Sequence, residues 1–154
     1  MEHIICIENR SPDVIARLVD VWESSVRETH LFLTEDDIGA IKPEVPTGLS
    51  AIEHLYCYQD EQGVLLGFIG VAERKIEMLF VDAAARGKGI GRQLIDFAII
   101  NLHAIFVDVN EQNTQGVGFY QHLGFSIVGR DEQDEQGRPF PILHMRKWNP
   151  SHDD

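Results

Sequence analysis

A glycine-rich stretch near the middle of the chain has the residue types that bind a phosphate group. Gly87, Gly89 and Gly91 follow the apolar run 78–81 and stand where a helix would begin. Glycine lets the backbone approach a ligand without a Cβ atom in the way, and the first N–H groups of a helix lack partners within it. Three cationic residues accompany these glycines: Arg86, Lys88 and Arg92. The stretch therefore predicts a cradle for an anion, and a phosphate fits it best.

Two common nucleotide-binding motifs do not fit these glycines. A P-loop requires GxxxxGK followed by Ser or Thr, and Gly87-Lys88-Gly89 has neither that spacing nor the hydroxyl residue. A dinucleotide-binding fingerprint requires GxGxxG and several strand–helix–strand units, whereas the glycines here alternate and a single such unit surrounds them. Asp108 stands about where a ribose-binding acid would, and we interpret it as a polar residue near a strand end.

Hydrophobic patterning predicts the elements that position the cradle. An apolar run at 76–81 predicts the strand that leads into it, and the stripe from Leu94 to Leu102 predicts a helix that lies against a sheet. The next apolar run, 104–109, predicts a parallel strand reached by a right-handed crossover. The anion would then lie at the carboxyl end of the first strand, as ligands do in open α/β sheets.

The flanking segments predict further helices and antiparallel strands. Segment 11–28 has a capping serine, a proline at the first helical position and an amphipathic pattern, so it predicts a helix. A strand hairpin is expected within 55–72. After the crossover, Asn113 can cap a short helix, and two final strands are expected at 125–129 and 140–148.

Length and charge limit the classes of protein and partner. A chain of 154 residues predicts a single domain, 1–148, with a loose tail at 149–154. A net charge of −12 argues against nucleic-acid or membrane partners, which need basic surface. The chain has neither a membrane-length apolar run nor a signal-peptide pattern, so we expect a cytoplasmic protein. Cys6 and Cys57 are interpreted as buried, reduced thiols, and no metal site is expected.

Two motifs together carry a resemblance to a known family. Arg86-x-x-Gly89-x-Gly91 after an apolar strand is similar to the signature of the GCN5-related N-acetyltransferase (GNAT) superfamily. Asn113-x-x-Gly116 and Phe119-Tyr120-x-x-x-Gly124-Phe125 resemble its second conserved region. Gly116 stands where the superfamily usually has alanine, a change that keeps the residue small. Further segments, such as Gly137-x-Pro139-x-Pro141, resemble the small bacterial YjaB-type acetyltransferases.

The resemblance implies an α/β fold of the GNAT type. This is a mixed, mostly antiparallel sheet of six to seven strands with one central parallel strand–helix–strand unit and helices on both faces. It also implies that the co-substrate is acetyl-coenzyme A, whose pyrophosphate would lie in the cradle and whose pantetheine arm would follow the preceding strand. The implied cofactor-binding residues are Leu79, Phe80, Val81, Arg86, Gly87, Lys88, Gly89, Ile90, Gly91, Arg92, Asn113, Phe119 and Tyr120.

The implied chemistry is direct transfer of an acetyl group to a primary amine in a ternary complex. Tyr120 would be the general acid that protonates the leaving thiolate. A backbone N–H near Leu79 or Phe80 would stabilise the oxyanion. Two candidates for the general base stay open: Glu77 acting through water, and His30, which titrates near neutrality when unperturbed.

The acceptor is left open by the sequence. An acidic surface suits a cationic amine, such as a protein lysine, a protein N-terminus or a small amine. A homodimer is compatible with all these expectations. The alternative from another class is a module that binds acetyl-coenzyme A as a sensor without transferring its acetyl group.

Overall fold

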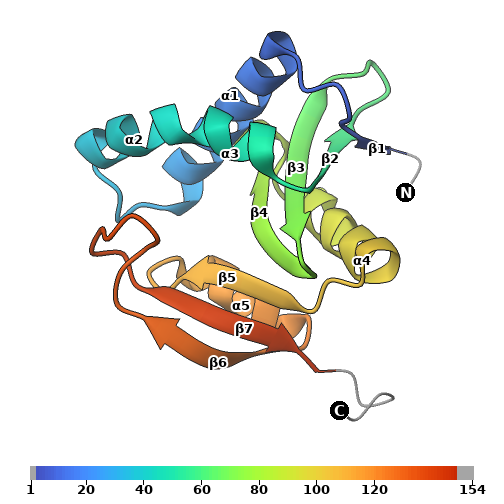
Figure 1. Ribbon diagram of the computed structural model, residues 1–154. Coiled ribbons are helices and arrows are strands. Elements are labelled where there is room, and N and C mark those ends of the chain that lie inside the picture. Colours follow the sequence, from blue (N-terminus) through green and yellow to red (C-terminus); the bar gives the residue numbers. More distant parts are fainter. Residues whose placement is uncertain (1–2, 149–154) are drawn as a thin grey trace.

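The computed structural model describes residues 3–148, and these form a seven-stranded sheet (Figure 1). The strand order is β1-β2-β3-β4-β5-β7-β6, with β4–β5 the one parallel pair among the described residues. The expected mixed sheet with one central parallel pair is therefore confirmed. The strands are β1 (Ile4–Cys6), β2 (His54–Gln59), β3 (Leu65–Ala72), β4 (Lys75–Val81), β5 (Phe106–Asn110), β6 (Phe125–Asp131) and β7 (Ile142–Lys147).

Helices cover both faces of the sheet, as expected. On one face, α1, α2 and α3 pack over side chains such as Leu55 and Phe68, and on the other α4 and α5 pack over side chains such as Ile69 and Val107. Adjacent strand residues therefore serve two different cores. The helical segments are α1 (Pro12–Thr29), α2 (Glu35–Ile41), η1 (Lys42–Glu44), α3 (Val45–Ala51), η2 (Ala83–Ala85), α4 (Ile90–Leu102) and α5 (Thr114–His122).

Capping residues set the boundaries of several helices. The Ser11 side chain accepts a hydrogen bond from Val14 N at 3.3 Å where α1 begins. Thr34 and Asp37 form a reciprocal capping box at the start of α2. Gly124, with φ +97°, lies just past α5, where a left-handed residue favours glycine. The helix start predicted at 11–12 is thus confirmed.

The two halves of the sheet separate between β4 and β5. This parallel pair has two rungs, Lys75 with Phe106 and Ile76 with Val107, and then the strands part. Figure 1 shows β5, β7 and β6 turning away from the β1–β4 half beyond this point. The carboxyl end of β4 therefore has an open edge in the middle of the sheet, which is a slot for an extended ligand.

A β-bulge lies where the strands part. In the β3–β4 register, Gly70 pairs with Met78 and Val71 with Ile76, so Glu77 is the extra residue on β4. A bulge bends its strand and increases the local twist, and it redirects side chains next to it. The bend therefore begins at Glu77, one of the two candidate bases named from the sequence.

Three expectations lie outside the site. The tail expected at 149–154 is outside the described residues. Within 3–148, no helix combines the length and apolar character needed to cross a membrane. Cys57 is buried, and burial raises the pKa of its thiol to about 12. The expectation that Cys6 is buried was wrong: Cys6 is exposed because β1 is an edge strand of the sheet.

Candidate active site

The glycine segment forms a turn whose amides are free to bind an anion. Gly87 and Gly89 have φ values of +80° and +77°, a left-handed conformation that favours glycine. Gly89 caps α4 without a side-chain hydrogen bond. The backbone N–H groups from Gly87 to Arg92 donate to no acceptor within residues 3–148. These free donors at the N-terminus of a 13-residue helix suit a phosphate.

Asp82 fixes the turn that leads into the cradle. Its Oδ1 accepts hydrogen bonds from Ala84 N at 3.0 Å and from the Ser24 hydroxyl at 3.2 Å. Its Oδ2 lies 3.0 Å from the Arg17 guanidinium, and Ser24 Oγ also accepts from Ala83 N at 2.9 Å. Helix α1 is thereby tied to the end of β4, so the cradle is held at a fixed distance from the slot.

The three cationic side chains of the cradle differ in how they are held. Arg86 donates to Gln115 Oε1 at 3.1 Å, and Arg92 lies 3.5 Å from Asp96 on the same helix. Lys88 is exposed and has no acidic partner within the described residues. All three are at the surface, where they can contact the anionic end of a ligand without being buried.

A cavity of about 440 Å³ connects the cradle to the slot. Asn113 lies in its wall. A hydrogen bond fixes its side chain, because Oδ1 caps α5 by accepting from Gly116 N at 3.1 Å. A Cβ atom at residue 116 would lie 2.5 Å from Asn113 Nδ2. Glycine at 116, interpreted from the sequence as a neutral change, therefore gives the Asn113 side chain its room. The lining includes Leu79, Phe80, Val81, Arg86, Gly87, Gly89, Ile90, Gly91, Arg92, Asn113, Phe119 and Tyr120.

A larger cavity of about 890 Å³ meets the first one. Its wall includes the acidic loop 131–136 and charged side chains of β4, β5 and β7. From the segment 29–46, His30 lines this cavity. The two cavities share five lining residues: His30, Leu79, Phe80, Asn113 and Tyr120. A ligand in the cradle and a second ligand in the acidic cavity would meet at these residues.

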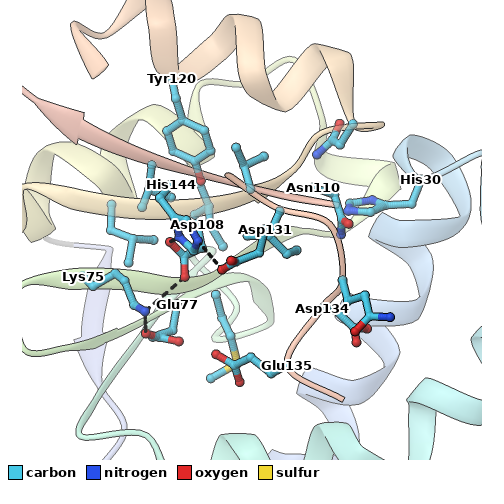
Figure 2. Close-up of a pocket in the computed structure, with 18 of the residues that line it drawn as sticks. His30, Lys75, Glu77, Asp108, Asn110, Tyr120, Asp131, Asp134, Glu135 and His144 are labelled. Carbon is cyan, nitrogen blue, oxygen red and sulfur yellow. Dashed lines mark hydrogen bonds and ion pairs between the residues drawn. The ribbon is translucent and has the colours of Figure 1, made fainter. Parts of the chain in front are cut away.

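Tyr120 is a buried, neutral phenol at this junction. It packs edge-on against Phe125, with 5.6 Å between ring centroids, and 7% of its surface is exposed. Burial raises the pKa of its hydroxyl above the usual value of 10 because the phenolate would be desolvated. Figure 2 shows Tyr120 pointing from α5 toward the acidic cavity. Tyr120 therefore keeps its proton at neutral pH and can donate it to an anion that forms nearby.

The backbone of β4 aims specific N–H groups into the slot. Asp82 N donates to Leu66 O on β3 at 2.8 Å, and paired residues alternate along an antiparallel ladder. The backbone N–H and C=O groups of Phe80 therefore point toward β3. Those of Leu79 and Val81 point the other way, toward the edge where β4 has parted from β5. Of the two positions considered for an oxyanion donor, Leu79 and Phe80, this alternation favours Leu79.

His30 is held as a neutral imidazole. Its ring packs near Phe32 and Phe80, with centroid distances of 5.5 and 6.3 Å, and burial lowers its pKa to about 4. The Thr29 hydroxyl donates to Ser25 O at 2.8 Å, so it accepts from His30 Nδ1 at 2.7 Å. The proton is therefore on Nδ1, and Nε2 keeps its lone pair. A group with so low a pKa is a weak base for an alkylammonium.

Glu77 belongs to a chain of ion pairs along the floor of the acidic cavity (Figure 2). Lys75 Nζ lies 2.9 Å from Glu77 Oε1 and 3.0 Å from Asp108 Oδ2. His144 Nδ1 and Nε2 lie 2.7 Å from Asp108 and 2.7 Å from Asp131. Hydrogen bonds that His144 donates to the Asp108 and Asp131 carboxylates raise its pKa above 6.5, and both ring nitrogens donate when it is protonated.

Most of these ion pairs were not predicted from the sequence. Glu77 was a candidate base and Asp108 was interpreted as a strand-end polar residue, while Lys75 and His144 received no role. One signal was available: Lys75, Asp108 and His144 are polar residues at alternate positions of otherwise apolar strands. Such alternation indicates a sheet face that no helix covers.

Comparison with known proteins gives a consistent result. Residues 40–147 match the acetyltransferase (GNAT) domain family. The chain is similar to peptidyl-lysine N-acetyltransferase YjaB of Salmonella typhimurium, with 35% identity over 136 residues that cover 84% of this chain and 88% of that protein. It is also similar to the protein of that name from Escherichia coli, with 34% identity covering 92% of this chain and 96% of that one.

A solved structure supports the same likeness. The solution structure of apo-form YjaB from Escherichia coli superposes with a TM-score of 0.83 at 32% sequence identity. The match covers 93% of this chain and 95% of that one. The similarity therefore extends over the slot, the cradle and the acidic cavity.

Proposed function

We propose, from the premise that this chain belongs to the GNAT acetyltransferase family, that it acetylates the side-chain amine of lysine in a peptide or protein. The chain is an N-acetyltransferase that transfers an acetyl group from acetyl-coenzyme A to a primary amine. The lysine acceptor is the further step. It is supported by the names of the two similar proteins, both peptidyl-lysine N-acetyltransferases.

The observation that carries the proposal is the meeting of two different cavities. One runs from free amides and cationic side chains toward the slot, and the other is walled by carboxylates, including Glu77, Asp108 and the 131–136 loop. An anionic co-substrate fits the first, and a cationic side chain fits the second. The thioester and the amine would be brought together where the cavities join.

We assign the co-substrate to the slot and cradle. The pyrophosphate takes the N–H groups of residues 87–92, and Arg86, Lys88 and Arg92 contact its outer oxygens. The pantetheine arm lies alongside β4 and pairs with the backbone groups of Leu79 and Val81, which point toward the separated edge. Asn113 and Phe119 line the far side of this channel. The whole span 1–148 would act as one N-acetyltransferase domain.

The residues at the junction suit direct transfer. The amine nitrogen attacks the thioester carbon, the C–S bond breaks, and the carbonyl oxygen passes through an oxyanion that accepts from Leu79 N–H. The attacking nitrogen, which becomes positively charged, loses a second proton to water as the amide forms. The thiolate takes the Tyr120 proton and leaves as the thiol, and water passes a proton back to Tyr120. The proton lost by the ammonium goes through water to the Glu77 carboxylate, which lines the acidic cavity, whereas His30, with a pKa of about 4, is a weak base for it.

A coenzyme A release assay tests the acceptor. Peptides blocked at the N-terminus and carrying one lysine should release thiol from acetyl-coenzyme A and gain one acetyl group at that lysine by mass spectrometry. Matched peptides with arginine in place of lysine should release none. Release with free N-termini or small amines alone would contradict the lysine assignment. Tight acetyl-coenzyme A binding without release for any amine would favour the sensor alternative.

We also propose a cytoplasmic location and no nucleic-acid or membrane partner. Two free thiols, Cys6 and Cys57, suit a reducing compartment, and a net charge of −12 disfavours polyanionic partners. Subcellular fractionation and binding of the purified protein to DNA or anionic vesicles test these points. Sedimentation tests the homodimer.

A further inference from the structure

One buried polar atom beside the slot has no hydrogen-bond partner. Among the side chains of residues 3–148, Asn110 Oδ1 is the buried nitrogen or oxygen that lacks one. Leaving a buried acceptor unpaired is costly, and native proteins rarely do so without a reason. Asn110 ends β5, where that strand has parted from β4, and its side chain lines the acidic cavity. The unpaired atom therefore lies in the wall where an acceptor would enter.

A second acceptor at this end of the cavity is also unpaired. His30 uses Nδ1 to donate to Thr29, so Nε2 has a lone pair and no partner within the described residues. His30 packs over Phe80 on β4, across the slot from the end of β5. In Figure 2 the side chains of His30 and Asn110 lie at the same end of the cavity, away from the Lys75–Glu77 pair.

We propose that Asn110 Oδ1 and His30 Nε2 together bind the two N–H bonds of the neutral acceptor amine as it attacks, and so select primary over secondary amines. This inference rests on the proposed function only for the presence of an amine at the junction of the cavities. It assigns Asn110 as a specificity-determining residue.

The hydrogen count of the nitrogen explains the selection. A primary ammonium has three N–H bonds: one proton leaves through water toward Glu77, and the other two remain in the neutral amine. When both remaining bonds donate to fixed acceptors, the lone pair is left to point at the thioester carbon. A secondary amine, such as Nε-methyl-lysine, keeps one N–H bond after the same proton loss. One of the two acceptors then stays unpaired.

The matched test replaces the acceptor without changing the volume of the side chain. Asn110→Leu has nearly the same size and shape as asparagine and no acceptor. Wild-type protein and variant are assayed with N-terminally blocked peptides carrying lysine or Nε-methyl-lysine. The wild type should prefer lysine by about tenfold or more in kcat/KM. Asn110→Leu should lose most of that preference because its kcat/KM for the lysine peptide falls. The KM for acetyl-coenzyme A should not change.

Thermal unfolding separates this role from a structural one. Because the Oδ1 atom is unpaired in the free protein, Asn110→Leu should unfold at the wild-type temperature or higher. A fall of several degrees would show that Asn110 has a structural partner, such as an internal water, and would overturn the proposal. Asn110→Asp keeps an acceptor oxygen at the same place and should retain the preference for lysine.

Two further controls keep the result decisive. Asn110→Ala opens space, so if it removes the discrimination while Asn110→Leu keeps it, the selection is steric and the proposal fails. The same comparison is run with butylamine and N-methylbutylamine. If lysine peptides are not acetylated but butylamine is, and its preference depends on Asn110, the lysine assignment falls while this inference stands. If no amine reacts, both fall.

Discussion

Lys75 and Asp108 join β4 to β5 at the last rungs before these strands part. Lys75 Nζ lies 3.0 Å from Asp108 Oδ2, and the rungs beside it are Lys75 with Phe106 and Ile76 with Val107. The same ammonium lies 2.9 Å from Glu77. One cation therefore fixes both the apex of the slot and the carboxylate assigned as the base.

Lys75→Met should weaken both the fold and the reaction. The change leaves Glu77 and Asp108 as two carboxylates without their shared cation, so we expect a loss of about 1–2 kcal/mol in unfolding free energy. Turnover should fall several-fold because Glu77 loses its anchor, while acetyl-coenzyme A affinity is kept. Urea unfolding and steady-state kinetics measure the two effects. Lys42→Met, which removes an exposed pair with Glu23, is the control and should change little. Equal effects at the two sites would contradict this assignment.

The bridge from Asp108 through His144 to Asp131 should make stability depend on pH. The folded-state pKa of His144 is raised above 6.5, so its contribution is complete below about pH 6.5 and is lost as pH rises through the folded-state value. His144→Gln should therefore lower the melting temperature most at the acidic end of this window. The difference in melting temperature from the wild type should shrink at higher pH. Melting temperatures of both proteins across this range give the difference. A gap that grows with pH would show that His144 is neutral in the folded protein.

Tyr120→Phe should separate binding from turnover. The ring contacts with Phe119 and Phe125 remain, so the fold and acetyl-coenzyme A affinity should be kept. Loss of the proton donor should lower kcat by at least about tenfold, within the range that a positioned general acid contributes. Calorimetry and thiol-release kinetics measure the two quantities. Tyr58→Phe, on β2 and outside both cavities, is the control. An unchanged kcat would remove Tyr120 from the mechanism.

Gly116→Ala should impair co-substrate binding with little change in stability. A Cβ there would lie 2.5 Å from Asn113 Nδ2, so the Asn113 side chain must move and its cap on α5 is weakened. Losing a cap costs about 1 kcal/mol, and alanine in a helix gains about 1 kcal/mol over glycine, so the two effects nearly cancel. The Kd for acetyl-coenzyme A should rise. Gly118→Ala, on the same helix with open space around it, should stabilise the protein and leave the Kd unchanged.

The parts of the site predicted from the sequence are those that local chemistry defines. Gly87, Gly89 and the capping residue Asn113 act on backbone within a few positions of themselves, so their spacing predicts both the cradle and α5. Their roles toward the co-substrate stay predictions that the mutations above test. The parallel strand–helix–strand unit was predicted from the apolar runs on each side of the cradle, and the mixed sheet around it was implied by the resemblance to the family.

The chain of ion pairs that runs from Glu77 to Asp131 was not predictable in the same way. Lys75 and Asp108 are 33 positions apart, and Asp108 and His144 are 36 apart, so their contact depends on the crossover and on strand register. The neutral state of His30 likewise depends on burial near Phe80, which is distant in sequence, as well as on its neighbours Thr29 and Phe32. Local spacing has no information on such distant contacts.

Because β4 parts from β5, a bound co-substrate occupies the position that a further strand would take in a continuous sheet. A ligand that fills the slot completes hydrogen bonding between two half-sheets that share two rungs. Binding to the folded chain alone stabilises it by about 2.7 kcal/mol at a ligand concentration 100 times the Kd. The lifetime of this protein against proteases should therefore follow the acetyl-coenzyme A supply, with degradation fastest when that supply is low.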